Sequence, residues 1–476
     1  MKTAFKKEKF QLRGNRYYAI GIALSIFAGM VGIRGLYTPI EGVYKYVCLL
    51  PILYAILNMV FIKVYRNVTL SVTIVLVFMF IRYVVSVLVL QIEKFPRGIY
   101  YIKSSNNVSF LTALLMGYEM LVIFWALSHL PQIENKLSDE EYVGRLLRKE
   151  NFSKLNIISI CIVMVTVLLH IIYPSLLSNF SLIIGDQVEG MVQNSVALQS
   201  NLPGGMRWIG YMGGIISRYI ILEWIVIRCF LKSLRRNKMF YWWMSIIVVG
   251  ANMLITTSMQ MVGIFFSLVL FYQIYRLYPK QRKLLFGMGV VIGCTFFGII
   301  LFTYWSTSLT YHSLSQMIQG YTNGFYNVYQ SQFAYDMGQQ SLVEKLEMFI
   351  VGDGLGSVNI VNRWINGVAS TQIYNAYIYG NASSNGGAII PLVAQCSYYF
   401  TIFLGPLISG VSIFLMRKFE TRSYNANGSI LLNSFASLIF AVTPFMYNYS
   451  ITIHIVTIMI IPIWFVSRMN KIEIKI

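Results

Sequence analysis

Apolar stretches long enough to cross a lipid bilayer recur about twelve times along this chain. A backbone surrounded by lipid finds no water to bond with, so each stretch is expected to form a helix whose amide groups bond to one another. The pattern predicts an all-α, polytopic integral membrane protein, with residues 1–476 forming a single transmembrane domain. The expected spans are 17–33, 43–62, 68–91, 108–130, 155–176, 208–231, 240–256, 259–275, 284–304, 388–415, 429–446 and 450–467.

The amino-acid composition excludes an ordinary soluble protein. Of the 476 residues, 57% are hydrophobic and only 12% are charged. The formal net charge of +20 is attributed to basic cytoplasmic loops, so no nucleic-acid partner is expected. The cysteines fall in apolar runs without metal-binding spacing, which predicts buried free thiols, no metal site and no cofactor. They are Cys48, Cys161, Cys229, Cys294 and Cys396.

The distribution of basic residues predicts which side of the membrane each loop faces. With the N-terminus inside, the segments on the cytoplasmic side hold 27 of the 38 lysines and arginines, and those on the other side hold 8. Basic residues concentrate on the cytoplasmic side of membrane proteins. Both termini are therefore expected in the cytoplasm, and the loops 177–206 and 305–387 are expected to face outward.

The outward loop 305–387 is the longest interruption of the apolar sequence. It is rich in Tyr, Asn, Gln, Ser and Gly and includes several Trp and Phe residues. A disordered segment lacks such aromatic residues. Amides, hydroxyls and flat rings suit an uncharged, polyhydroxylated ligand. We therefore expect an ordered loop that binds such a ligand; the alternative is a structural cap over the helices.

Two local patterns support order in this loop. Ser341 and Glu344 form a capping-box pattern that predicts a short helix ending near Gly352. Residues 352–356 (GDGLG) then predict a sharp glycine-rich turn. This turn is not a nucleotide-binding fingerprint, because no strand precedes it and no Lys-Ser/Thr pair follows.

Ionisable residues inside the spans are costly and mark candidate functional positions. Arg82 and Glu119 lie at similar depth in the third and fourth spans, so adjacent antiparallel helices can bring them together as an ion pair. A purely structural pair is the alternative. Arg218 lies at a comparable depth in the sixth span, and Glu223 lies one to two turns deeper on a different face of that helix.

Several of these residues suit an anionic ligand. The guanidinium of Arg218 would bind a diphosphate through paired hydrogen bonds. Arg207, Arg363 and Lys345, on the outer side, would extend such a site. His312 is the only histidine of the long loop and is a candidate base.

The overall layout resembles a known family. About twelve spans, two inward termini and two outward loops, the second of them larger, are similar to the Wzy-type oligosaccharide repeat-unit polymerases. These O-antigen and capsule polymerases share a GT-C-like architecture with the O-antigen ligases. The sequence similarity is confined to the GDGLG turn, the Asn375-Ala-Tyr segment and the NGGAIIPLVAQ run at 385–395. Tyr374 stands where many of those proteins have a histidine.

The resemblance implies a glycosyltransferase at the outer face of a bacterial cytoplasmic membrane. A growing glycan on undecaprenyl diphosphate would pass to a sugar hydroxyl of a fresh lipid-linked repeat unit, without nucleotide sugar or metal. Arg218, with Arg82 or Arg363, would stabilise the leaving diphosphate. Asp353, Glu223 and His312 are the candidate bases.

Other functions remain open at this stage. A lipid-linked oligosaccharide flippase has a similar length and number of spans, but it usually has short loops and related halves, and no internal repeat is visible here. An O-antigen ligase shares the chemistry and differs in the acceptor. Besides membrane lipids and lipid-linked oligosaccharides, the expected partners are a chain-length regulator and a flippase.

Overall fold

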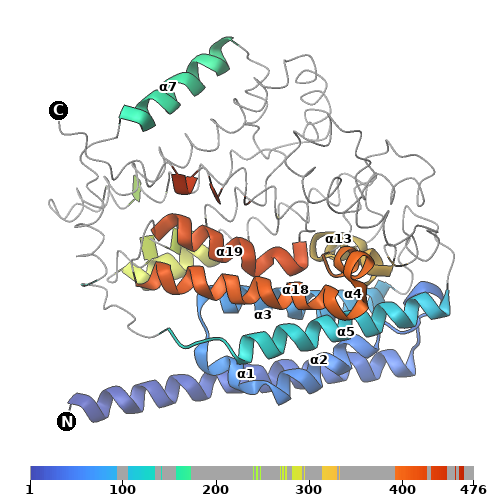
Figure 1. Cartoon of the computed structure of the whole chain (residues 1–476). Coiled ribbons are helices and arrows are strands. Elements are labelled where there is room, and N and C mark those ends of the chain that lie inside the picture. The colour runs from blue at the N-terminus through green and yellow to red at the C-terminus, as the bar shows by residue number, and fades with distance from the viewer. Residues whose placement is uncertain are drawn as a thin grey trace. The chain divides into compact units, whose positions relative to one another are not determined.

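The computed structural model describes residues 2–93, 105–133, 157–172, 281–291, 314–329, 392–425 and 430–446, with isolated positions elsewhere. Every regular element in these ranges is helical, which confirms the all-α class for this part of the chain (Figure 1). The α-helices are α1 (Lys2–Tyr37), α2 (Leu49–Val60), α3 (Leu70–Phe80), α4 (Ser86–Glu93), α5 (Asn106–Ser128), α7 (Ile157–Ile172), α13 (Leu314–Thr322), α18 (Leu392–Tyr424) and α19 (Ile430–Met446). Shorter turns form η1 (Gly42–Tyr44), η2 (Ile62–Asn67) and the π-helical η3 (Ile81–Val85).

Two compact units make up the chain. The first comprises Met1–Gln132, Leu309–Lys418 and Phe440–His454, and the second comprises Ile133–Ser308, Phe419–Ile439 and Ile455–Ile476. The first unit holds α1 to α5 and α13, together with part of α18 and the last residues of α19. It contains all the contacts on which the candidate site depends.

Four helical stretches among the described residues are long and apolar enough to cross a membrane, as in a multi-pass membrane protein. They contain 19 to 24 residues each, which at about 1.5 Å per residue matches a hydrocarbon core of about 30 Å. They confirm the first four expected spans. The stretches are Tyr17–Tyr37, Gly42–Val60, Leu70–Glu93 and Asn106–Ser128.

The later spans are described only in part. Helices α7 and α19 lie in the expected spans 155–176 and 429–446, and α18 covers most of the span 388–415. Of the span 284–304, residues 284–291 and two isolated positions are described. The spans 208–231, 240–256, 259–275 and 450–467 fall wholly or largely outside the described residues, as does the loop 177–206.

Two helices extend beyond their apolar windows. Helix α1 begins at Lys2, well before the expected start of its span at residue 17. Helix α18 continues to Tyr424, beyond the expected end of its span at residue 415, and Arg417 and Glu420 in this extension are buried. Lysine, arginine and glutamate propagate helices well, so an apolar window defines the lipid-crossing length and not the helix end.

The described cysteines are free thiols, as predicted, but they differ in burial. Cys48 is buried, whereas Cys161 and Cys294 are exposed on the surface of the protein. The expectation that all of them are buried was therefore wrong for these two. An apolar run predicts membrane insertion, but it does not separate a helix face that contacts protein from one that contacts lipid.

Helices α1 and α2 approach each other closely because glycine lines their contact. A Cβ atom on Gly32 would collide with the side chain of Ile52, so no larger residue fits there without movement. Buried Asn58 of α2 then donates to the Gly21 carbonyl at 2.8 Å and to Ser25 Oγ at 2.7 Å. Hydrogen bonds of this kind hold helices together in a membrane, where the hydrophobic effect contributes little to helix association.

Asn58 also links this helix pair to η2. Its Oδ1 accepts a hydrogen bond from the Tyr65 hydroxyl at 3.0 Å. Burial raises the pKa of Tyr65, although its hydrogen bonds with neighbouring side chains oppose that rise. The phenol therefore stays protonated and keeps its donor at neutral pH.

Part of the long loop 305–387 is folded onto one end of the first unit. The carboxylate of Glu93, the last residue of α4, accepts the backbone N–H groups of Leu314 at 2.8 Å and Ser315 at 3.2 Å. These groups belong to the first turn of α13, where a helix lacks internal acceptors and favours negative charge. Glu93 thus caps a helix far from it in the sequence.

Aromatic side chains complete this attachment. The ring of Tyr44, at the start of the second span, stacks on Tyr326 with 6.0 Å between ring centroids. The hydroxyl of Tyr329 accepts a hydrogen bond of 2.8 Å from the Ser105 backbone, just before α5 begins. Residues 314–329 therefore contact the ends of three spans on the same side of the helices. Residues 314–322 of the predicted loop are helical and packed against the spans, whereas the Ser341–Glu344 capping box and the 352–356 turn lie outside the described residues.

A sharp turn separates α13 from the next helical residues. Asn323 has a φ of 47°, in the left-handed region, and the Gly324 N–H bonds to the Gln319 carbonyl at 2.8 Å. Buried Gln319 also accepts the Tyr326 N–H at 2.7 Å through its side chain. This turn ends α13 and places Tyr326 against Tyr44.

Pro444 creates a contact between α19 and α18. Because proline has no N–H, it cannot donate to the carbonyl of Phe440 one turn earlier. The hydroxyl of Ser412 on α18 donates to this carbonyl instead. The carbonyl that the proline leaves without its helical donor thus accepts a hydrogen bond from a side chain of the neighbouring helix.

Replacement of Glu93 by alanine should loosen the first turn of α13. Two charge-assisted hydrogen bonds would be lost, each of which contributes about 1.5–3 kcal/mol. We expect amide hydrogen exchange at Leu314 and Ser315 to accelerate about tenfold or more. E41A is the matched control, because Glu41 is exposed at the same end and caps nothing. Unchanged exchange in E93A would contradict the capping role.

Replacement of Ser412 by alanine should leave the Phe440 carbonyl without the Ser412 hydrogen bond and destabilise the protein by about 1–3 kcal/mol. In a P444A background the new N–H can bond to that carbonyl, so the same substitution should cost much less. Thermal unfolding of the four proteins of this double-mutant cycle measures the difference. Equal costs in the two backgrounds would show that Ser412 does not compensate for the proline.

Candidate functional site: a buried ion pair at mid-membrane depth

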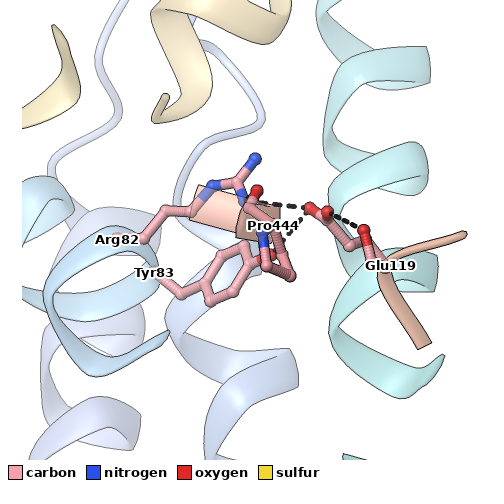
Figure 2. A network of polar contacts seen from close by, with 5 residues as sticks. Arg82, Tyr83, Glu119 and Pro444 are labelled. Atoms are coloured by element: carbon pink, nitrogen blue, oxygen red, sulfur yellow. Dashed lines mark hydrogen bonds and ion pairs between the residues drawn. The ribbon is translucent and has the colours of Figure 1, made fainter. Parts of the chain in front are cut away.

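Arg82 and Glu119 form the ion pair that the sequence predicted. Arg82 Nη1 lies 3.0 Å from Glu119 Oε2, and both side chains have no exposed surface (Figure 2). Arg82 stands near the middle of the stretch Leu70–Glu93, about 17 Å from either end at a rise of about 1.5 Å per residue. A charge at this depth is stable only when it is paired.

The carboxylate of Glu119 is held from two further directions. The Tyr83 hydroxyl donates to Oε2 at 3.1 Å, and the Ser409 hydroxyl of α18 donates to Oε1 at 2.8 Å. Oε2 therefore accepts from Tyr83 in addition to its ion pair with Arg82, and Oε1 accepts from Ser409. This distribution fixes the carboxylate between η3, α5 and α18.

Arg82 is also bound to the end of α19. Its Nη1 donates to the carbonyl oxygen of Pro444 at 3.1 Å. Pro444 lies in the last turn of α19, where carbonyl groups lack partners within the helix and the helix dipole favours a cation. The guanidinium thus serves two acceptors through a single nitrogen, as Figure 2 shows.

The other side of the Arg82 guanidinium carries two donors without acceptors. Neither Nε nor Nη2 has a hydrogen-bond partner among the described residues, although both atoms are buried. Figure 2 shows a guanidinium nitrogen directed away from Glu119. Nε and Nη2 lie on one edge of the planar group and point their N–H bonds in parallel. Such an edge fits two oxygen atoms of a phosphate or carboxylate.

Aromatic rings flank this guanidinium. Arg82 Cζ lies 5.3 Å from the centre of the Tyr83 ring and 5.8 Å from that of Phe445. Rings at this distance stabilise a cation and exclude water from it. The Phe445 ring in turn stacks on Phe78 at 5.8 Å between centroids.

The backbone around Arg82 departs from a regular α-helix. Residues Ile81–Val85 form the π-helical turn η3, between α3 and α4. A π-turn inserts an extra residue into the helix and changes the direction of the side chains near it, and such turns are frequent at functional sites. Here both Arg82 and Tyr83, adjacent in sequence, reach the same carboxylate.

Four parts of this site were not predicted from the sequence: the π-turn, Tyr83, Ser409 and Pro444. Tyr83 stood beside the one arginine of its span, and Pro444 interrupted an apolar run, so both had a weak signal. Ser409 had none, because a serine within a membrane helix usually bonds to its own backbone.

The remaining candidate residues lie outside the described residues. They are Arg207, Arg218, Glu223, His312, Lys345, Asp353, Arg363 and Asn375. Their roles stay predictions. Within the described part of the chain, no group of three or more His, Cys, Asp or Glu residues could hold a metal ion.

Comparison with known proteins gives no relative. No family model, no curated protein and no solved structure matches this chain.

Removal of one member of the ion pair should be far more harmful than removal of both. R82A or E119A leaves a buried charge without its partner, which costs about 3–5 kcal/mol. The double variant R82M/E119L should be more stable than either. Thermal unfolding of the purified proteins in detergent measures this, with Y83F as a control that removes one hydrogen bond and costs about 1 kcal/mol. Additive losses in the double variant would contradict the pairing.

Proposed function

We propose that this protein is an oligosaccharide repeat-unit polymerase of the bacterial cytoplasmic membrane, similar to the Wzy-type enzymes. It has a GT-C-like bundle of about twelve spans, with both termini in the cytoplasm and the loop 305–387 outside. The observation that carries the proposal is the buried arginine at mid-membrane depth whose Nε–Nη2 edge has no acceptor among the described residues.

The reaction takes place at the outer face of the membrane. The acceptor sugar hydroxyl attacks the anomeric carbon of the growing glycan and forms a new glycosidic bond. The bond from that carbon to undecaprenyl diphosphate breaks, and its electron pair leaves on the diphosphate oxygen. The hydroxyl proton passes to a base, for which Asp353, Glu223 and His312 are the candidates.

Arginine is suited to the leaving group in this reaction. Arg218, with Arg82 or Arg363, stabilises the negative charge that develops on the diphosphate. Arg207 extends the anion site at the membrane surface, and Asn375 contacts the substrate from the long loop. The ordered segment 314–329 supports a binding role for that loop, since it anchors one part of it to the span ends.

Two other functions share parts of this argument. A flippase for lipid-linked oligosaccharide is favoured by the mid-membrane ion pair, because paired charges at that depth are also typical of transport sites. An O-antigen ligase would use the same donor and leaving group and differ in its acceptor. In the polymerase, a flippase and a chain-length regulator are the expected partners.

The size and location of the glycan in a strain without this gene test the proposal. We expect single repeat units, exposed outside on lipid or on the cell surface, because export continues and polymerisation stops. An R218A allele should fail to restore polymer although its protein reaches the membrane.

Two other outcomes would overturn the polymerase. Lipid-linked units accumulating on the cytoplasmic face would identify a flippase. Full-length polymer on the carrier lipid, lacking only its final attachment, would identify a ligase. Polymer of normal length made with R218A would remove that residue from the site.

A further inference from the structure

The ion pair and the open guanidinium edge make contradictory electrostatic demands. Arg82 and Glu119 neutralise each other in the apolar interior, and both are fully buried. An anion that occupied the Nε–Nη2 edge would bring a second negative charge to one positive charge. A net charge at this depth costs several kcal/mol.

No other described charge near the pair offsets that excess. Helix α2 and the last residues of α19 contain no charged side chain, and in α5 Glu119 is the only one. In the stretch Leu70–Glu93 the only other charge is Glu93, about 17 Å away at the end of α4. On α18, Arg417 and Lys418 lie more than two turns beyond Ser409, about 12 Å along the helix. Among the described residues, Tyr83 is the one other titratable group that contacts the carboxylate.

We infer that Arg82 binds a two-oxygen anion, a phosphate or carboxylate, through Nε and Nη2, and that Glu119 takes up one proton as the anion binds. The proton comes from water and converts the carboxylate into a carboxylic acid. Arg82 keeps its charge and transfers its pairing to the anion, so the proton on Glu119 offsets one negative charge of the anion. The inference rests on the proposed function only for the identity of the anion, a lipid-borne diphosphate.

The surroundings of Glu119 accommodate a protonated carboxyl group. Ser409 and Tyr83 contact it through hydroxyl groups, which can accept as well as donate. The new O–H therefore has an acceptor within reach after one hydroxyl rotates. A lysine or arginine in either place would not accept a hydrogen bond.

The free edge also provides a reason for the anion to enter. Two buried donors without acceptors cost free energy that an occupant with two oxygens would recover. Protein atoms cover both donors, so entry requires movement around the guanidinium, where the rings of Tyr83 and Phe445 lie. An apolar setting at this depth favours an anion carried on a lipid over one dissolved in water.

Binding of farnesyl diphosphate to the purified full-length protein in detergent tests this inference. The probe has an isoprenoid chain and two phosphoryl groups, and its affinity can be measured by calorimetry from about pH 8 to about pH 6. One linked proton makes the affinity rise up to about tenfold for each pH unit lowered. The probe also titrates in this range, so the wild type is compared with E119Q at each pH.

Two variants separate the parts of the mechanism. E119Q replaces the carboxylate with a neutral amide that can still form hydrogen bonds, but it leaves Arg82 without a counter-charge. This variant should therefore bind farnesyl diphosphate more tightly than the wild type at pH 8. Its affinity should also lose the part of the pH dependence that comes from Glu119. R82K keeps a charge to pair with Glu119 but lacks the two-donor edge, so its affinity should fall about tenfold or more. R34K, at an exposed position of α1, is the matched control and should bind as the wild type does.

Several outcomes would overturn the inference. Identical pH slopes in the wild type and E119Q would exclude the proton, and equal affinities in R82K and the wild type would exclude the arginine. Binding of farnesol as tightly as the diphosphate would exclude an anion site, and tighter binding of inorganic pyrophosphate would exclude a lipid-borne anion. A flippase phenotype in the deletion strain would refute the polymerase and leave this result untouched, so the two proposals fail separately.

Discussion

The ion pair between Arg82 and Glu119 is the contact on which the first unit depends. Neither charge can remain in an apolar interior without the other, so the helices that carry them must stay together. The same requirement extends outward: Ser409 brings α18 to the carboxylate, and the Pro444 carbonyl brings the end of α19 to the guanidinium. The need of buried polar groups for hydrogen-bond and ion-pair partners, more than apolar burial, therefore decides which helices meet here, as expected where lipid replaces water.

In the described part of the long loop, at the end of the spans, polar backbone groups also find hydrogen-bond partners. Glu93 satisfies the exposed N–H groups of α13, and Tyr329 satisfies the backbone of Ser105. Stacking of Tyr44 on Tyr326 adds apolar contact at the same end. A segment fixed at these points has lost much of its conformational freedom, which would lower the entropic cost of the proposed binding.

In the proposed mechanism, Arg82 combines a structural and a chemical role in one side chain. One nitrogen holds Glu119 and α19, and the opposite edge is directed elsewhere. Under the proposed anion binding, loss of Arg82 would therefore reduce stability and affinity together. Substitutions that preserve charge but change geometry separate the two roles, because an ammonium group can replace the ion pair but not the planar, two-donor edge.

The sequence by itself determined the class of protein, the positions of the first four spans and the pairing of Arg82 with Glu119. Each follows from a local rule: apolar length, basic flanks, and equal depth of opposite charges in neighbouring helices. The tertiary structure alone decided that α18 continues through Arg417, that Cys161 is exposed, and that Ser409 reaches the carboxylate. These depend on which helix faces meet, and apolar periodicity is weak in a helix that contacts lipid on one side and protein on the other, since both surroundings are apolar.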